Sequence, residues 1–312
     1  MSIQTEEISR AYICIESGKM QEAEEIYKEL LSEDLGNRII SGSLTWCNYW
    51  KEKIQNLGDF STYEQGEYLL SCWKQFELMV KTRSKSEYDE KIIYSFKKGI
   101  FSMALELYIN ELQKQEGQGK WEEYRKAGFC YKKLGSYENA MECLMNAARY
   151  ASGNPTVMAE LADCYALCGD EKMAKAMFRE AFFIDPLKID LWYLEAPLIK
   201  VLVNEVQQKG YEGNELLSWI PVYGKLLGIF NVQRQLRAQE AGKIRQEIFA
   251  RQNELKDKTN KEEIIKPRLL NLYFWIIDYM LSTHDSLRNI QQMHLEIKLL
   301  DKTVYNLYTQ NN

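Results

Sequence analysis

The chain has 312 residues, with 40 Lys and Arg against 45 Asp and Glu, and therefore a net charge of −5 at pH 7. A chain of this length can bury a sizeable core, and its slightly acidic charge argues against wholesale nucleic-acid binding. Because it has only 5 prolines and no long run of alternating β-branched residues, we predict an all-α fold.

The sequence indicates neither export nor membrane insertion. The first residues carry acids and lack the basic start and apolar core of a secretory signal. The longest apolar run, Leu269 to Leu281, is interrupted by Asn271 and Asp278 and is shorter than the roughly 20 residues of a membrane span. Seven scattered cysteines do not resemble a disulfide framework. We therefore expect a cytoplasmic protein.

The first 118 residues are predicted to hold helical units. Residues 7–31 form a helix pair with a turn at Gly18. Residues 37–81 form two longer amphipathic helices joined around Gly58, which carry large apolar residues: Trp46, Trp50, Leu70, Trp73 and Phe76. A third pair is expected over 86–114, with its turn at Gly99.

Two stretches, starting at Trp121 and at Pro155, repeat each other at a spacing of thirty-four positions. Small residues let antiparallel helices approach closely, large ones fill the spaces between them, and a glycine ends each first helix. Asp170 is placed to cap the helix after the second glycine. The matching pairs are Gly128 and Ala162, Tyr131 and Tyr165, Gly135 and Gly169, Ala140 and Ala174, Leu144 and Phe178, and Ala147 and Ala181.

This pattern resembles the tetratricopeptide repeat (TPR), a helix–turn–helix unit of the same period. The match is strongest over 121–188 and weaker over 7–31 and 86–114. The resemblance implies an αα-hairpin repeat solenoid, wound as a right-handed superhelix and closed by a C-terminal helical capping region. The expected domains are N-terminal TPR-like and degenerate repeats over 1–118, two well-matched units over 119–188, and a C-terminal region of long helices over 189–312.

The first part of the C-terminal region departs from the repeat pattern. A helix over about 189–209 is expected, with a kink at Pro197. The stretch 211–230 is rich in Leu, Gly and aromatic residues, and its helix is expected to break or kink near Pro221.

The last eighty residues are predicted to form long helices. A polar helix with a narrow apolar stripe covers about 232–258, and an exposed charged linker follows from Lys256 to Glu263. Two further helices, about 267–282 and about 285–309, form a closing hairpin, the first opened by Pro267.

We predict no catalytic residue, metal site or cofactor. The sequence lacks GxxxxGK[ST], GxGxxG before a helix, GxSxG and HExxH. His284 and His294 have no carboxylate spacing that indicates a metal site, and Cys164 and Cys168 have too few neighbouring ligands for zinc. Between 231 and 268, ten basic residues face six acidic ones. Because the two signs interleave, we interpret this stretch as a solvated helix face rather than a nucleic-acid or acidic-partner patch.

Candidate partner contacts come from the resemblance, because TPR proteins bind peptides along a concave wall lined by the first helix of each pair. A subset clamps a C-terminal carboxylate with Lys, Asn and Arg, but the corresponding positions here do not match. Helical spacing places Arg125, Phe129 and Lys132 on one face, where Phe129 either contacts a partner or packs on a neighbouring helix. The candidate wall consists of Tyr12, Arg125, Phe129, Lys132, Lys133, Asp163, Ala166 and Leu167.

Three functions remain open from the sequence. The leading hypothesis is a non-enzymatic scaffold or adaptor that binds a peptide or protein segment on the concave TPR surface. A second is a regulatory repeat domain that controls a transcription or signalling protein. A third is an enzyme whose site lies unrecognised in 190–312.

Overall fold

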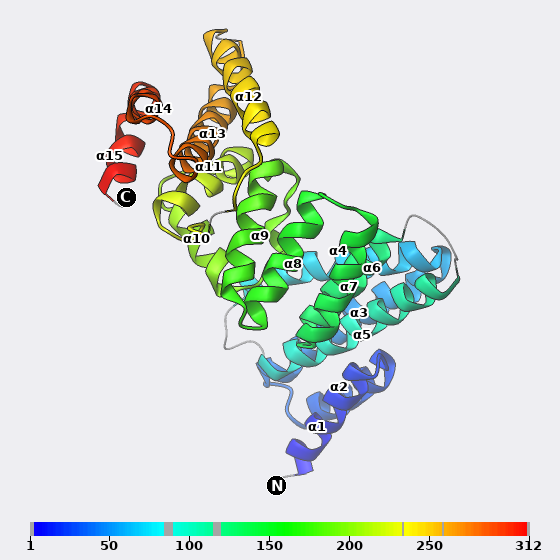
Figure 1. Ribbon diagram of the computed structural model, residues 1–312. Coiled ribbons are helices and arrows are strands. Elements are labelled where there is room, and N and C mark those ends of the chain that lie inside the picture. The colour runs from blue at the N-terminus through cyan, green and yellow to red at the C-terminus, as the bar shows by residue number, and fades with distance from the viewer. Residues whose placement is uncertain (1–2, 84–89, 115–119, 233, 258, 311–312) are drawn as a thin grey trace. The chain divides into compact units, whose positions relative to one another are not determined.

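The computed structural model describes residues 3–83, 90–114, 120–232, 234–257 and 259–310 (Figure 1). Within these residues the fold is all-α, with fifteen α-helices and short 3-10 turns, as predicted. The chain divides into two compact units, unit 1 (Met1–Tyr150) and unit 2 (Ala151–Asn312). The division falls between the two stretches that repeat each other in sequence, so each unit contains one of them.

Unit 1 is built from seven described α-helices and one 3-10 turn. Its helices are α1 (Ile3–Glu16), α2 (Met20–Glu33), α3 (Arg38–Gln55), η1 (Asn56–Asp59), α4 (Thr62–Thr82), α5 (Glu90–Lys114), α6 (Trp121–Lys133) and α7 (Tyr137–Tyr150). Helices α3 and α4 are the two long helices expected over 37–81, and η1 contains Gly58 in the connection between them.

Helices α1 to α5 form a closed ring of neighbours. Each helix packs on the next along the chain, and α5 also packs on α1. Gly99 of α5 lies against Ile15, and Met103, one turn later, lies against Gly18, so α1 and α5 run parallel. A ring of five helices that alternate in direction must contain one parallel pair, and α1 with α5 is that pair.

Large aromatic rings fill the centre of this ring of helices. Trp46 and Phe76 meet edge to face at 5.0 Å between centroids, Trp50 stacks on Trp73 at 5.9 Å, and Phe76 contacts Phe96 at 5.8 Å. Each such aromatic pair stabilises the fold by about 0.5–1.5 kcal/mol beyond the area that it buries. The aromatic residues of the 37–81 stretch therefore form a core between α3, α4 and α5.

The prediction of a helix pair over 86–114 was wrong. The described part of this stretch is one continuous 25-residue helix, α5, and Gly99 lies in its interior. A Cβ at Gly99 would collide with the carbonyl oxygen of Ile15 in α1. This glycine therefore permits close approach between two helices and does not form a turn; residues 86–89 lie outside the described residues.

The α6/α7 hairpin confirms the packing expected for a repeat. A Cβ on Gly128 would lie 2.9 Å from Cγ of Leu144 and 3.1 Å from the carbonyl oxygen of Ala140, so a larger residue would force the two helices apart. Gly135 follows α6 with φ +80°, the left-handed conformation that ends a helix without a Cβ clash.

Unit 2 begins with the second sequence repeat as the hairpin α8 (Pro155–Leu167) and α9 (Glu171–Ile184). Gly169 has φ +89°, and the Asp170 side chain accepts a hydrogen bond from Met173 N at 3.0 Å. The predicted turn and cap are thus both confirmed. The remaining elements are η3 (Pro186–Lys188), η4 (Leu191–Tyr193), α10 (Pro197–Gln207), α11 (Gly213–Leu226), α12 (Ala238–Lys256), α13 (Glu262–Ser282), α14 (Leu287–Leu300) and α15 (Lys302–Gln310).

Pro197 and Pro267 of unit 2 lie differently from their predictions, and the break that was one alternative near Pro221 does not occur. Residues 186–193 form two 3-10 turns, and Pro197 begins α10, because proline is well suited to the first position of a helix. Pro221 lies inside α11, which continues through it. Pro267 is also an interior residue, since α13 starts at Glu262.

The last predicted helix, over about 285–309, is two helices. Asp301 between them has an extended backbone with φ −154° and ψ 108°. Its carboxylate accepts hydrogen bonds from the backbone N–H groups of Thr303 and Val304, both at 2.9 Å. Asp301 therefore ends α14 and caps α15.

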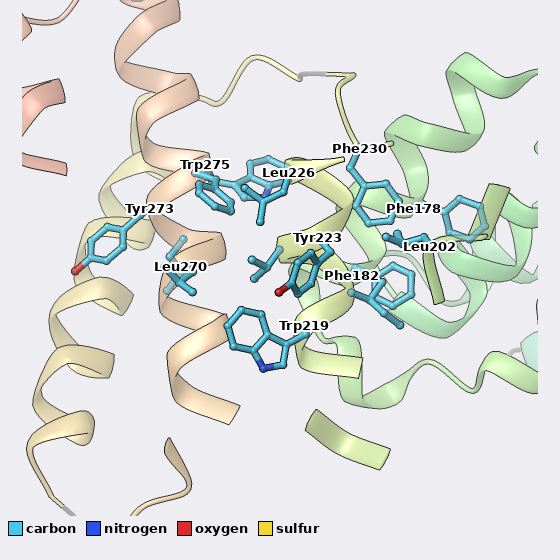
Figure 2. Close-up of a cluster of buried hydrophobic side chains, with 14 of the residues drawn as sticks. Phe178, Phe182, Leu202, Trp219, Tyr223, Leu226, Phe230, Leu270, Tyr273 and Trp275 are labelled. Carbon is cyan, nitrogen blue, oxygen red and sulfur yellow. The ribbon is translucent and has the colours of Figure 1, made fainter. Parts of the chain in front are cut away.

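The core of unit 2 lies around α11 and α13 (Figure 2). Trp219, Tyr223 and Leu226 project from α11 toward α13, whose Leu270 and Trp275 are almost fully buried. Phe230 stacks on Phe178 and Phe182 of α9 at 6.5 and 5.9 Å. The second helix of the second repeat, α9, thus packs directly against the C-terminal helices, which bury Phe178 and Phe182.

Candidate partner-binding surface

The positively charged end of α6 lies over aromatic rings. The Lys133 ammonium is 5.3 Å from the Phe129 ring centroid and 5.9 Å from that of Phe101 in α5. The two rings meet edge to face at 5.7 Å, and Lys133 Nζ lies 3.7 Å from Glu77 of α4. Phe129 is fully buried, so it has the packing role that was the alternative to partner contact.

An ionic network missed by the sequence predictions ties α4, α5 and α6 together. Lys126 Nζ lies 2.7 Å from Glu67 Oε2, and the Tyr108 hydroxyl donates to Glu67 Oε1 at 2.6 Å. Burial and the nearby Glu67 carboxylate raise the pKa of Tyr108 far above its ordinary value, so the phenol stays a donor. Lys126 is only 5% exposed; this cation of α6 therefore stabilises the helix packing.

Tyr12 lies at the seam between α1 and α5. Glu16, one turn after Tyr12, pairs with Lys98 of α5 at 2.7 Å and accepts a hydrogen bond from Ser95 at 3.3 Å. Tyr12 lies four residues before Glu16, and Tyr94 lies four residues before Lys98. Because α1 and α5 are parallel, the two tyrosines lie at the same level along the two helices. We call these four residues, Tyr12, Glu16, Tyr94 and Lys98, the α1–α5 seam.

The α1–α5 seam exposes both aromatic rings and charged groups to solvent. Tyr94 is 62% exposed, Tyr12 is half-buried, and the neighbouring Ile13 is 64% exposed. Sequence reasoning missed Tyr94 because the helix that carries it was interpreted as a hairpin. The available signal was Tyr94 four residues before Lys98, a spacing that puts both on one face of a helix.

The predicted residues of α8 belong to unit 2 and differ in exposure. Asp163 is fully buried, and its carboxylate accepts backbone N–H hydrogen bonds from Glu195 at 2.9 Å and from Ala196 at 2.7 Å. It thereby holds the segment before α10 against α8. Leu167 and Ala166 are half-buried. Of the predicted wall, Tyr12, Arg125, Phe129, Lys132 and Lys133 lie in unit 1, while Asp163, Ala166 and Leu167 lie in unit 2.

The remaining cations of α6 differ in exposure. Arg125 is half-buried, whereas Lys132 is 1% exposed, and its ammonium lies 5.8 Å from the Phe129 ring centroid. Arg125 is therefore the more accessible of the two.

The family model of the tetratricopeptide repeat matches residues 8–37 and 124–154. These residues cover most of the α1/α2 and α6/α7 hairpins. The chain therefore contains tetratricopeptide repeats. A comparison with curated proteins gave no match. TPR hairpins generally serve as protein–protein interaction modules, which is the function expected from the sequence pattern.

Four basic residues of the stretch 231–268 form ion pairs: Arg234, Arg251, Lys266 and Arg268. Arg234 pairs with Glu180 and Glu240, Arg268 pairs with Glu247, and Lys266 pairs with Asp301 at 2.9 Å. These contacts fit the interpretation of interleaved charges as a paired and solvated helix surface.

The described residues contain neither a group of three metal ligands nor a helix that could span a membrane. Across residues 3–83, 90–114, 120–232, 234–257 and 259–310, no group of three His, Cys, Asp or Glu side chains is placed to hold a metal ion. Over the same ranges, none of the helices combines the length and apolarity needed to cross a membrane.

Proposed function

We propose that this TPR protein is a non-enzymatic, cytoplasmic scaffold or adaptor that binds a peptide or protein segment through the first helices of its repeats. The carrying observation is that the family model matches two hairpins whose helices pack closely as repeat units. TPR domains are typically non-enzymatic, and an array of such hairpins offers an extended surface to a partner.

Within unit 1, the α1–α5 seam supports this proposal best, because it joins α1, the first helix of the N-terminal repeat, to the neighbouring helix α5. Tyrosine rings supply rigid contact area with little loss of side-chain entropy, and Tyr94 is the large exposed ring of the seam. The Glu16–Lys98 pair leaves half of the Lys98 side chain exposed, which can orient a polar backbone. We therefore expect a segment with apolar or aromatic side chains spaced along an extended or helical backbone. We also propose contacts at three residues that are less exposed than Tyr94: Arg125, Lys133 and Leu167.

The test is selection of peptides from a displayed random library on the purified full-length chain. Affinities of the selected peptides are then measured for Tyr94→Ala and for Leu78→Ala, a control residue that is 61% exposed on α4. We expect Tyr94→Ala to weaken binding about tenfold, as for an aromatic hot spot, with Leu78→Ala unchanged. Failure to select any peptide would count against the scaffold function. Equal binding by both variants would remove the α1–α5 seam as the site.

A further inference from the structure

Unit 2 contains a half-open cavity of about 320 Å³, a volume within the range of small-ligand sites. Its walls come from segments far apart in sequence: the end of α9 with η3, the middle of α11, the second half of α12, and the first half of α13. The lining residues are Phe182, Ile184, Asp185, Pro186, Leu187, Ser218, Pro221, Glu247, Arg251, Ile264, Ile265, Arg268 and Asn271.

Most of the cavity wall is apolar. Phe182 is fully buried in the core of unit 2 (Figure 2), and Ile265 is 8% exposed. Ile184 and Leu187 also line the cavity, yet each is 41% exposed, so they lie at its mouth. An occupant would enter between these two side chains and bury an apolar body against the inner wall.

Each ionisable side chain of the described cavity wall already has a partner of opposite charge, and Asp185 pairs with Lys188 at 3.9 Å. Arg268 makes a two-point contact with Glu247 at 2.8 and 3.0 Å and donates to the Phe183 carbonyl. Arg251 pairs through Nη1 with Glu254 at 2.6 Å, while its buried Nε lies 3.7 Å from Glu247 and makes no hydrogen bond within the described part of the chain. Burial acts to raise the pKa of Glu247, but the Arg268 and Arg251 guanidinium groups outweigh it and hold that pKa below its ordinary value. A charged occupant would have to break one of these pairs, whereas an uncharged one would not.

Asn271 supplies the polar feature of the wall. It is 4% exposed, and its Nδ2 has no hydrogen-bond partner within the described part of the chain. A buried amide without a partner is costly, and that cost is recovered when an acceptor reaches it. The terminal torsion of Asn is broad, so the amide plane can turn toward an occupant. Ser218 donates to the Asn214 carbonyl, which leaves its hydroxyl oxygen able to accept from a ligand N–H.

We propose that this cavity binds a small uncharged amide with an apolar body, whose carbonyl oxygen accepts a hydrogen bond from Asn271. The apolar wall selects the body of the ligand, the paired charges select against ions, and the buried amide of Asn271 selects a carbonyl. The site lies wholly in unit 2 and is separate from the α1–α5 seam of unit 1.

The test uses the full-length chain and two matched probes. Acetanilide carries an amide carbonyl, and N-ethylaniline is the same molecule with that carbonyl replaced by a methylene. We expect acetanilide to bind about tenfold more tightly, as measured by calorimetry or by NMR titration of side-chain amides. N-acetyl-leucine N-methylamide, measured alongside, shows whether a peptide-like amide binds better than a simple one. Tighter binding of either amide than of N-ethylaniline supports the proposal.

Asn271→Leu separates a ligand role from a structural one. The substitution keeps a similar volume and removes a buried unpaired amide, so the melting temperature without ligand should be unchanged or higher. The preference for acetanilide over N-ethylaniline should disappear. Leu187→Trp at the mouth should weaken both probes, and Leu299→Trp, at a residue 74% exposed on α14, should weaken neither. Equal affinity of the two probes for the unmodified chain, no binding of any amide, or a preference that survives Asn271→Leu would overturn the proposal.

Discussion

Two buried carboxylates, Asp163 and Asp278, each hold a specific connection between segments. Asp163 accepts two backbone N–H groups, and Asp278 of α13 pairs with Arg179 of α9 at 2.5 Å and with Lys225 of α11 at 3.0 Å. A charge taken out of water is stable only when partners replace its hydration. Removing one partner of such a set is therefore expected to cost more than removing the set as a whole.

Glu24 of α2 offers a test of pH dependence. Its carboxylate accepts from Lys28 at 2.6 Å and from Lys51 of α3 at 2.5 Å, and these bonds lower its pKa from the ordinary 4.5. A lowered carboxyl pKa adds stability that is fully present above the unfolded pKa and is lost as the pH falls through the folded pKa. Glu24→Gln should therefore destabilise the protein at pH 7 by about 1 kcal/mol, a low figure because solvent screens the exposed Lys28.

The measurement for Glu24 is urea unfolding of the wild-type chain and of Glu24→Gln between pH 7 and pH 3. The gap between the two midpoints should stay constant down to about pH 4.5 and then narrow. A gap that is the same at pH 3 as at pH 7 would show that the carboxylate charge is not the cause.

Helix α5 sets the arrangement of unit 1 because it packs on α1, α4 and α6. Its contact with α1 depends on Gly99, where the Ile15 carbonyl occupies the place of a side chain. Helix α6 uses Gly128 in the same way against α7. In both cases a residue that weakens an isolated helix is retained because it lets two helix backbones approach.

Gly99→Ala and Gly242→Ala should change stability in opposite directions. The first places a methyl group against the backbone of α1 and should destabilise the chain by about 1–3 kcal/mol. The second lies in α12, where a methyl group would meet only open space, so alanine should stabilise the helix by about 0.5–1 kcal/mol. Denaturant midpoints of both variants test this, and destabilisation of equal size by both would argue against the close α1–α5 contact.

At the scale of the whole molecule, the repeat pattern and the compact units do not coincide. The two stretches that match at thirty-four residues belong to different units. In unit 2, the α8/α9 hairpin is joined to the C-terminal helices by Phe178 and Phe182 and by the Arg179–Asp278 pair. The second repeat and the C-terminal helices therefore share one core.

In limited proteolysis, the connection between α12 and α13 should be the first site of cleavage. Helix α12 ends at Lys256 and α13 starts at Glu262, and the described residues from Thr259 to Glu263 are exposed. We expect trypsin to cut after Lys256 or Lys261 before other sites, because exposed connections with few apolar contacts are preferred substrates. Mass spectrometry of the earliest fragments provides the readout. Earliest cuts between Gly135 and Gly169 would contradict this order.

The sequence by itself determined the local features of this protein. The helix–turn–helix repeats, the left-handed glycines Gly135 and Gly169, and the Asp170 cap were all predictable, because each depends on residues within one or two helical turns. The turn at Gly99 was predicted wrongly, because a glycine that ends a helix and one that permits close packing look alike in a sequence.

Tertiary structure decided everything that depends on residues distant in the chain. The return of α5 to α1, which closes the ring of helices and creates the α1–α5 seam, depends on contacts about eighty residues apart. The burial of Phe129 and Asp163, and the cavity around Asn271, likewise arise from several helices meeting. Hydrophobic spacing shows which face of a helix is buried, but not which helix covers it, since burial of apolar surface is non-directional.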